Sequence, residues 1–125
     1  MKKICLILLI IAGITSAGLL HAASLNDTQF DQYVQLTKNS KANPPGMTLV
    51  ADKTYRVMYI TMPIAISYSS VTPEAIAKMK DAMLSSLKKS AADCKVIKDL
   101  KITVVYNFMT TDKYLFSIPF SYQEF

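Results

Sequence analysis

The chain has 125 residues, with 14 Lys and Arg side chains against 9 Asp and Glu, and a formal net charge of +5. After residue 23 it contains no histidine and no tryptophan, and the only cysteine and glycine there are Cys94 and Gly46. This composition excludes a Ser-His-Asp triad, a Cys-His pair, a zinc site with imidazole ligands and a glycine-rich phosphate loop. We therefore expect no cofactor and no metal.

Residues 1–23 have the order of a bacterial secretory signal peptide. Lys2 and Lys3 precede an apolar run that extends from residue 4 to about residue 12, and small residues follow before a polar segment. We expect cleavage after Ala22 or Ala23, and export to the periplasm or the medium. An uncleaved anchor is the alternative, since residues 4–20 lie at the lower limit of the length that spans a bilayer. That anchor would be the only contact with a membrane.

The remaining chain, residues 24–125, has the length of one small domain. Without Lys2 and Lys3, 12 of the 14 basic side chains remain against 9 acidic ones, a net charge of +3. The lysines alternate with acids instead of gathering in one patch, so we expect no nucleic-acid partner. Asp93 and Asp99 lie beside lysines and are interpreted as parts of this solvated surface.

The first predicted element of this domain is an amphipathic helix of about three turns that ends near Lys38. Asn26 and Gln29 have the spacing of a capping box, so Asn26 is the predicted N-cap. Residues 39–46 contain Asn43-Pro44-Pro45-Gly46, which predicts a linker, because consecutive prolines remove backbone donors and Gly46 permits a turn. Residues 24–46 are thus an N-terminal helix and a Pro-rich linker, and residues 47–125 are the α+β body.

Two strand-like stretches begin the body. Residues 47–51 lead through a polar turn to residues 55–62, which are rich in β-branched and aromatic side chains and apolar on both sides. Pro63 requires a bulge, an edge or a break. Residues 64–68 then alternate again, so one kinked strand and two separate strands are both compatible with the pattern.

A second helix is predicted from Thr72 to Ala91. Thr72 is its N-cap, Pro73 occupies the first helical position and Glu74 lies in the first turn, where the helix dipole favours negative charge. Lys80 falls inside the apolar stripe, and we expect its stem to cover apolar surface while its ammonium reaches water. The stripe consists of Ile76, Met79, Met83, Leu84 and Leu87, and we expect it to pack against Val57, Tyr59, Val104, Tyr106, Phe116 and Ile118.

The chain ends in an antiparallel hairpin formed by residues 101–108 and 114–122, with a polar turn at residues 110–113. Pro119 predicts that the last strand is an edge, because proline has no N–H for a second neighbour. The predicted fold class is α+β, a two-layer sandwich with a small antiparallel sheet and helices packed on one face, following the N-terminal signal peptide.

Cys94 has no partner within residues 24–125, which leaves a buried thiol, an intermolecular disulfide or a reactive thiol, of which burial is favoured. Carboxylates, lysines and serines are the remaining catalytic residue types, and no pair of them has a distinctive spacing. We therefore identify no catalytic residue and expect a protein that is not an enzyme.

The functional signal is the abundance of aromatic residues. Seven tyrosines and five phenylalanines are concentrated in the predicted strands, and Tyr is enriched where proteins bind each other. We expect an exported binding protein of the inhibitor, immunity or assembly-accessory type, with a protein partner. The candidate binding residues are Tyr114, Phe116, Phe120 and Tyr122, of which only Tyr114 and Tyr122 are expected to be accessible. A periplasmic carrier with a methionine-lined pocket for a small apolar ligand is the first alternative, and a carboxylate- or lysine-dependent enzyme is the second.

Overall fold

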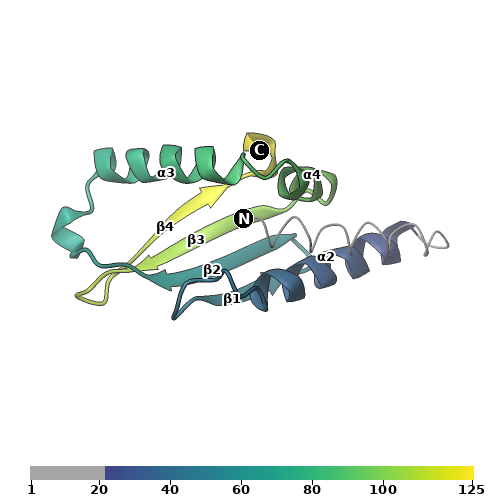
Figure 1. Cartoon of the computed structure of the whole chain (residues 1–125), viewed down its shortest axis with the longest axis horizontal. Helices are drawn as coiled ribbons and strands as arrows, with labels where there is room; N and C mark the ends of the chain where they lie inside the picture. The colour runs from purple at the N-terminus through teal and green to yellow at the C-terminus, as the bar shows by residue number, and fades with distance from the viewer. Residues whose placement is uncertain (1–21) are drawn as a thin grey trace.

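The computed structural model describes residues 22–125, with side chains from Asn26 onward, so residues 1–21 of the predicted signal peptide lie outside the described residues. No helix in this described part has both the length and the apolar character needed to cross a bilayer. The elements follow one another as α2 (Ala22–Lys38), β1 (Thr48–Asp52), β2 (Val57–Pro63), η1 (Tyr68–Ser70), α3 (Pro73–Leu87), α4 (Ala91–Asp99), β3 (Thr103–Met109), β4 (Leu115–Phe120) and η2 (Tyr122–Glu124) (Figure 1).

The four strands form one sheet in the order β1-β2-β3-β4. β1 pairs with β2 and β3 pairs with β4 in antiparallel fashion, whereas β2 and β3 are parallel. The central pair is parallel because α3 and α4 carry the chain back along the sheet before β3 begins, as a crossover connection must. The α+β class is confirmed, and the prediction of a purely antiparallel sheet is wrong, since the sheet is mixed.

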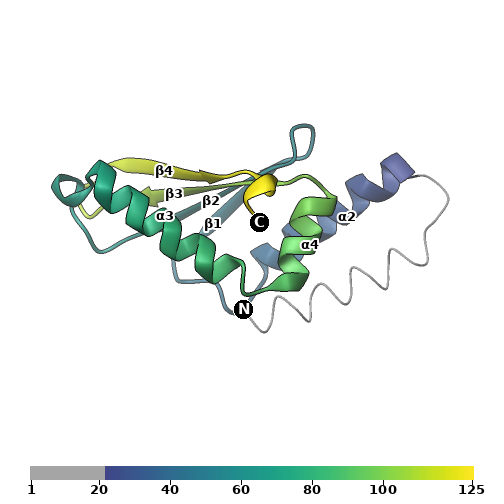
Figure 2. The same cartoon turned by 90° about the horizontal axis from the view of Figure 1, so that it is seen from above.

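The helices α2, α3 and α4 lie on the same side of the sheet (Figure 2), which gives the predicted two-layer arrangement for the described residues. The core lies between these layers. Met58, Ile60, Val104 and Ile118 reach it from the sheet, and Phe30 reaches it from α2. Pro119 lies in β4, which is an edge strand as predicted.

α2 ends at Lys38 as predicted, but it begins at Ala22, so Asn26 lies inside the helix and is not its N-cap. The Pro-rich linker caps the C-terminus of α2. The Asn43 side-chain amide donates hydrogen bonds to the carbonyls of Thr37 (2.7 Å) and Lys38 (3.2 Å), two of the groups that a helix C-terminus leaves without intrahelical partners. Gly46 has φ +79°, and a Cβ there would lie 3.2 Å from Cγ of Pro63, so the turn requires glycine.

The alternating residues 64–68 are not a strand. β2 ends at Pro63, and after Ile64 donates one hydrogen bond to the carbonyl of Met109 (2.9 Å), the chain leaves the sheet. It then forms the short 3-10 helix η1. Residues 64–68 therefore lie at the end of the sheet, where no strand pairs with them along their length.

α3 begins as predicted, with the Thr72 hydroxyl accepting a hydrogen bond from the N–H of Ala75 (3.1 Å). It ends at Leu87 and not at Ala91, because Ser90 starts a new helix: its hydroxyl accepts from the N–H of Asp93 (3.3 Å) at the beginning of α4.

The apolar stripe of α3 packs on the core but is only partly buried. Its predicted partners Val57 and Tyr59 face away from the helices, and Met58 and Ile60 are buried in their place. Lys80 lies as expected, with Nζ 5.6 Å from the centre of the Phe120 ring and 3.1 Å from the Glu124 carboxylate.

Candidate interaction surface

The four candidate binding residues are not gathered on one surface. Phe116 and Phe120 are core residues, 9% and 0% exposed, because both point from β4 toward the helices. Tyr114 immediately precedes β4 and is 55% exposed, whereas Tyr122 lies beyond the strand in η2 and is half-buried. Of the two tyrosines expected to be accessible, Tyr114 is the one that the structure exposes strongly.

Tyr114 packs against Tyr68, which the sequence analysis did not select. Their ring centres are 4.8 Å apart and the rings are inclined by 30°. Tyr68 is 47% exposed, so both rings combine mutual contact with a large accessible surface. We name this pair, Tyr68 and Tyr114, the aromatic corner. The alternation in residues 64–68 concealed it, because that pattern predicted a strand.

The aromatic corner is held by hydrogen bonds between the β3–β4 turn and the segment that leads into η1. The N–H of Thr111 donates to the carbonyl of Ile66 (2.9 Å), and the N–H of Tyr68 donates to the Asp112 carboxylate (2.9 Å). Hydrogen bonds from Thr110 and from the Tyr68 N–H hold the pKa of Asp112 below its usual range. The two rings are therefore positioned by a fixed backbone.

A second exposed surface is the side of the sheet that faces away from the helices, which we name the open face. Within residues 22–125 no helix packs against it. A row of paired residues crosses all four strands there: Val50, Tyr59, Val105 and Pro119. The neighbouring row is polar and uncharged: Thr48, Thr61, Asn107 and Ser117. Asp52 is the only charged residue among the outward-facing positions of the strands.

Buried polar groups connect α2, α4 and the sheet. Asp93 is 7% exposed, and its carboxylate accepts hydrogen bonds from the hydroxyls of Ser90 (2.5 Å) and Tyr33 (3.1 Å). Burial raises the pKa of Asp93, against the opposing effect of these hydrogen bonds, and burial also raises the pKa of Tyr106 to about 12. Asp93 was interpreted as a surface charge beside lysines, and that interpretation is wrong.

A cavity of about 60 Å³ adjoins Asp93, Tyr33, Thr37 and Tyr106 and is otherwise lined by apolar side chains. This volume holds a few water molecules, far less than the several hundred Å³ of a typical ligand pocket. The carrier alternative expects a pocket lined by Met58, Met62, Met79 and Met83, and of these the cavity contacts Met58. Asp93 serves the fold here, because it lies in the first turn of α4 and ties that helix to α2.

The buried carboxylate makes stability depend on pH. Since its pKa is raised in the folded protein, the folded state holds the Asp93 proton more tightly than the unfolded state does. Stability should therefore fall as pH rises from about 4 through the raised pKa, by up to about 1.4 kcal/mol per pH unit. Asp93→Asn keeps the shape and an acceptor without titrating. Urea midpoints measured from pH 4 to 8 should decline more steeply for the natural protein, and parallel profiles would contradict this assignment.

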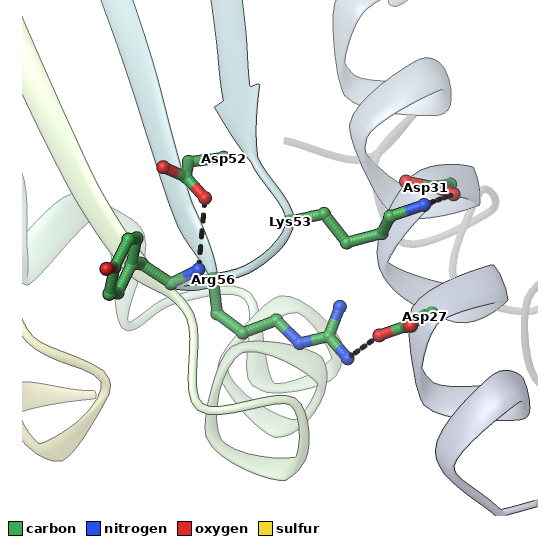
Figure 3. Close-up of polar contacts among 6 residues, drawn as sticks. Asp27, Asp31, Asp52, Lys53 and Arg56 are labelled. Carbon is green, nitrogen blue, oxygen red and sulfur yellow. Dashed lines mark hydrogen bonds and ion pairs between the residues drawn. The ribbon is translucent and has the colours of Figure 1, made fainter.

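α2 is also fixed to the β1–β2 turn by charged residues (Figure 3). Nζ of Lys53 lies 3.2 Å from the Asp31 carboxylate. The Arg56 guanidinium lies 2.5 Å from the Asp27 carboxylate. The guanidinium also lies over the Phe30 ring, 5.0 Å from its centre. Arg56 thus covers the aromatic residue by which α2 enters the core.

Cys94 is half-buried, so the favoured prediction of a buried thiol holds in part. Its Sγ donates to the carbonyl of Leu87 (3.6 Å), and its accessible side meets an open surface hollow of about 600 Å³ lined mainly by α4 residues. Among residues 22–125 no group of three His, Cys, Asp or Glu side chains could hold a metal ion.

Comparisons of this chain with protein-family models, with curated proteins and with solved structures find no match. The described residues provide two exposed surfaces suited to contact, the aromatic corner and the open face, together with one small buried cavity and the open hollow beside Cys94.

Proposed function

We propose that this is an exported, non-catalytic protein that acts by binding another protein in the cell envelope or outside the cell, through the aromatic corner. The observation that carries this proposal is the pair of tyrosine rings that contact each other at 4.8 Å and yet remain 47% and 55% exposed. Tyrosine is enriched among the residues that dominate binding energy. An exposed pair is a ready anchor for a partner.

The fixed backbone around the corner supports the same proposal. Binding loses free energy when it must order loops and side chains, so a surface that is already ordered binds more tightly for the same contact area. The hydrogen bonds from Thr111 to Ile66 and from Tyr68 to Asp112 provide this order before any partner arrives. The matching partner would present a shallow apolar cleft with hydrogen-bond acceptors near its rim for the two tyrosine hydroxyls.

The alternatives have weaker support. A carrier of an apolar ligand needs an enclosed cavity of several hundred Å³, and the cavity beside Asp93 has about 60 Å³. The larger hollow beside Cys94 is open to solvent and lined by charged residues, among them Lys88, Lys95 and Asp99. An enzyme would need its perturbed carboxylate to face a substrate. Asp93 instead accepts hydrogen bonds from Ser90 and Tyr33, which gives it a sufficient structural role.

The test is capture of partners from the envelope fraction of the source organism, with the exported protein as bait. Tyr114→Ala and Tyr68→Ala should each reduce the recovery of a stoichiometric partner about 10-fold or more, since residues of this kind contribute about 2 kcal/mol at the centre of an interface. Isothermal titration with the identified partner then gives the affinity change directly.

The matched control is Tyr55→Ala, which removes a tyrosine that is 77% exposed in the β1–β2 turn, away from the aromatic corner. This variant should capture the partner as the natural protein does. Full capture by folded Tyr68→Ala and Tyr114→Ala variants would exclude the corner as the binding surface. Turnover of a substrate that is abolished by a single Asp, Glu or Lys substitution would overturn the non-catalytic role.

The exported location has its own test. If the predicted signal peptide is removed after Ala22 or Ala23, the protein isolated from cells should begin at Ala23 or Ser24. Mass spectrometry of the intact protein measures this within one residue. A mass that retains Met1 on most molecules would contradict cleavage and would favour the membrane-anchor alternative.

A further inference from the structure

We propose that the open face is where two copies of this chain pack sheet against sheet, about a two-fold axis that runs parallel to the strands between β2 and β3. This contact is separate from the aromatic corner, which lies at the end of the sheet. The dimer would therefore present two corners to partner proteins, and each of the two proposals can fail without the other.

The open face carries almost no charge. A sheet with one solvated face normally alternates apolar residues with polar and charged ones. Here Asp52 is the only outward-facing charge in the four strands, whereas 23 of the 125 residues are charged in the whole chain. Depletion of charge marks the centre of protein interfaces. Because the chain carries a net positive charge, a neutral face is also the side on which two copies approach with least repulsion.

The register of the strands provides the second argument. A two-fold axis parallel to the strands places β2 over β3 of the second copy and β1 over its β4. Tyr59 then faces the smaller Val105 of the other copy, and Val50 faces its Pro119, so the apolar rows of the two copies coincide. The polar rows also coincide, with Thr61 opposite Asn107 of the second copy. Sheets that pack in this way lie about 10 Å apart and interdigitate along such rows.

The same arrangement avoids the one possible clash of like charges. Asp52 lies on the edge strand β1, which the axis places opposite β4 and not opposite β1 of the second copy. The two Asp52 carboxylates are therefore far apart, at opposite borders of the contact. Pro119, which has no N–H to offer, restricts strand pairing between copies at the β4 edge.

The area of the contact lies at the lower limit for a specific interface. Four strands spaced about 4.8 Å apart and about 20 Å long present roughly 400 Å² of sheet per copy. Two copies together approach the lower limit of about 1,000 Å² for a specific interface once the protruding side chains are included. We therefore expect a dissociation constant in the micromolar range, with monomers at nanomolar concentration.

Sedimentation equilibrium of the exported protein from about 1 to 300 μM should show a reversible monomer–dimer equilibrium. Tyr59→Lys and Val105→Glu should each weaken the dimer at least 10-fold, because each buries two unpaired charges, one per copy. An equimolar mixture of these two variants should dimerise again, since the new lysine of one chain faces the new glutamate of the other. Lys78→Glu on the solvent side of α3 is the control and should dimerise normally.

A measurement without substitutions keeps the proposal testable if a variant does not fold. Chemical nitration of the natural protein should modify Tyr59 less at 300 μM than at 1 μM, whereas Tyr55 should react equally at both concentrations. A monomer throughout this range, a dimer unaffected by both variants, or folded variants whose mixture stays monomeric would each overturn the proposed two-fold contact. Unchanged nitration of Tyr59 would overturn it as well.

Discussion

Replacing Phe120 with alanine should lower the free energy of unfolding by about 3–5 kcal/mol, a large fraction of the stability of a small domain. Phe120 is fully buried, and its ring meets Tyr106 edge to face at a centroid distance of 5.8 Å. It also lies 6.2 Å from the Phe125 ring. Phe120→Ala thus leaves a cavity at the point where β4, β3 and the C-terminal segment meet. Urea denaturation monitored by circular dichroism measures the loss.

Leu115→Ala is the matched control for Phe120→Ala. It truncates another large apolar residue of the same strand, but Leu115 is 56% exposed on the open face. Its cost should stay within about 0.5 kcal/mol, as for most surface substitutions. Similar midpoints for the two variants would show that the inward and outward faces of β4 are assigned incorrectly.

Phe30→Ala should destabilise the protein by a similar amount, about 3–5 kcal/mol, and should act first on α2. Phe30 is 1% exposed and is enclosed between the core and the Arg56 guanidinium. Without the ring, the remaining attachments of α2 include Tyr33, Val34 and the ion pairs of Asp31 and Asp27. The Lys53–Asp31 pair is exposed on both sides, and exposed ion pairs contribute about 0–1 kcal/mol each. Hydrogen exchange should show loss of amide protection in α2 before loss in β3.

Gln35→Ala provides the control on the same helix, because Gln35 is exposed and alanine favours the helix. Its midpoint should equal that of the natural protein or slightly exceed it. If Phe30→Ala leaves the protection of α2 unchanged, the helix is held mainly by other contacts, and the role assigned to Phe30 is wrong.

Elements with a local chemical signal were predictable from the sequence. Thr72 and Pro73 fix the start of α3 because the first N–H groups of a helix have no partners within it. The Thr72 hydroxyl accepts a hydrogen bond from one of these groups, and Pro73 has no N–H that needs a partner. The final hairpin was predictable because polar residues interrupt two alternating stretches, and Pro119 correctly marked its edge. These signals depend on a few neighbouring residues, so no tertiary information is needed to interpret them.

Features that depend on contacts distant in sequence were not predictable. β2 is apolar on both sides, so its pattern could not decide whether Tyr59 or Ile60 faces the helices. The parallel pairing of β2 with β3 arises from the crossover through α3 and α4, which no local pattern encodes. The candidate site was found in part: Tyr114 was selected by its strand position, whereas Tyr68 joins it only through the tertiary fold.

The sheet is divided into two hairpins, and this division determines the order in which we expect its strand pairs to form. Each hairpin, β1 with β2 and β3 with β4, pairs strands that are close in sequence. The parallel pairing of β2 with β3, which we name the seam, instead requires closure of the long segment that contains α3 and α4. Closing a long loop costs entropy that short turns avoid, so the seam should form last. The sheet thus consists of two β-hairpins that are joined only by the parallel pairing of β2 with β3. A backbone cut in the exposed Lys88-Lys89 turn would leave each half with its own hairpin, while the contact of Lys80 in α3 with Phe120 in β4 would still join the two halves.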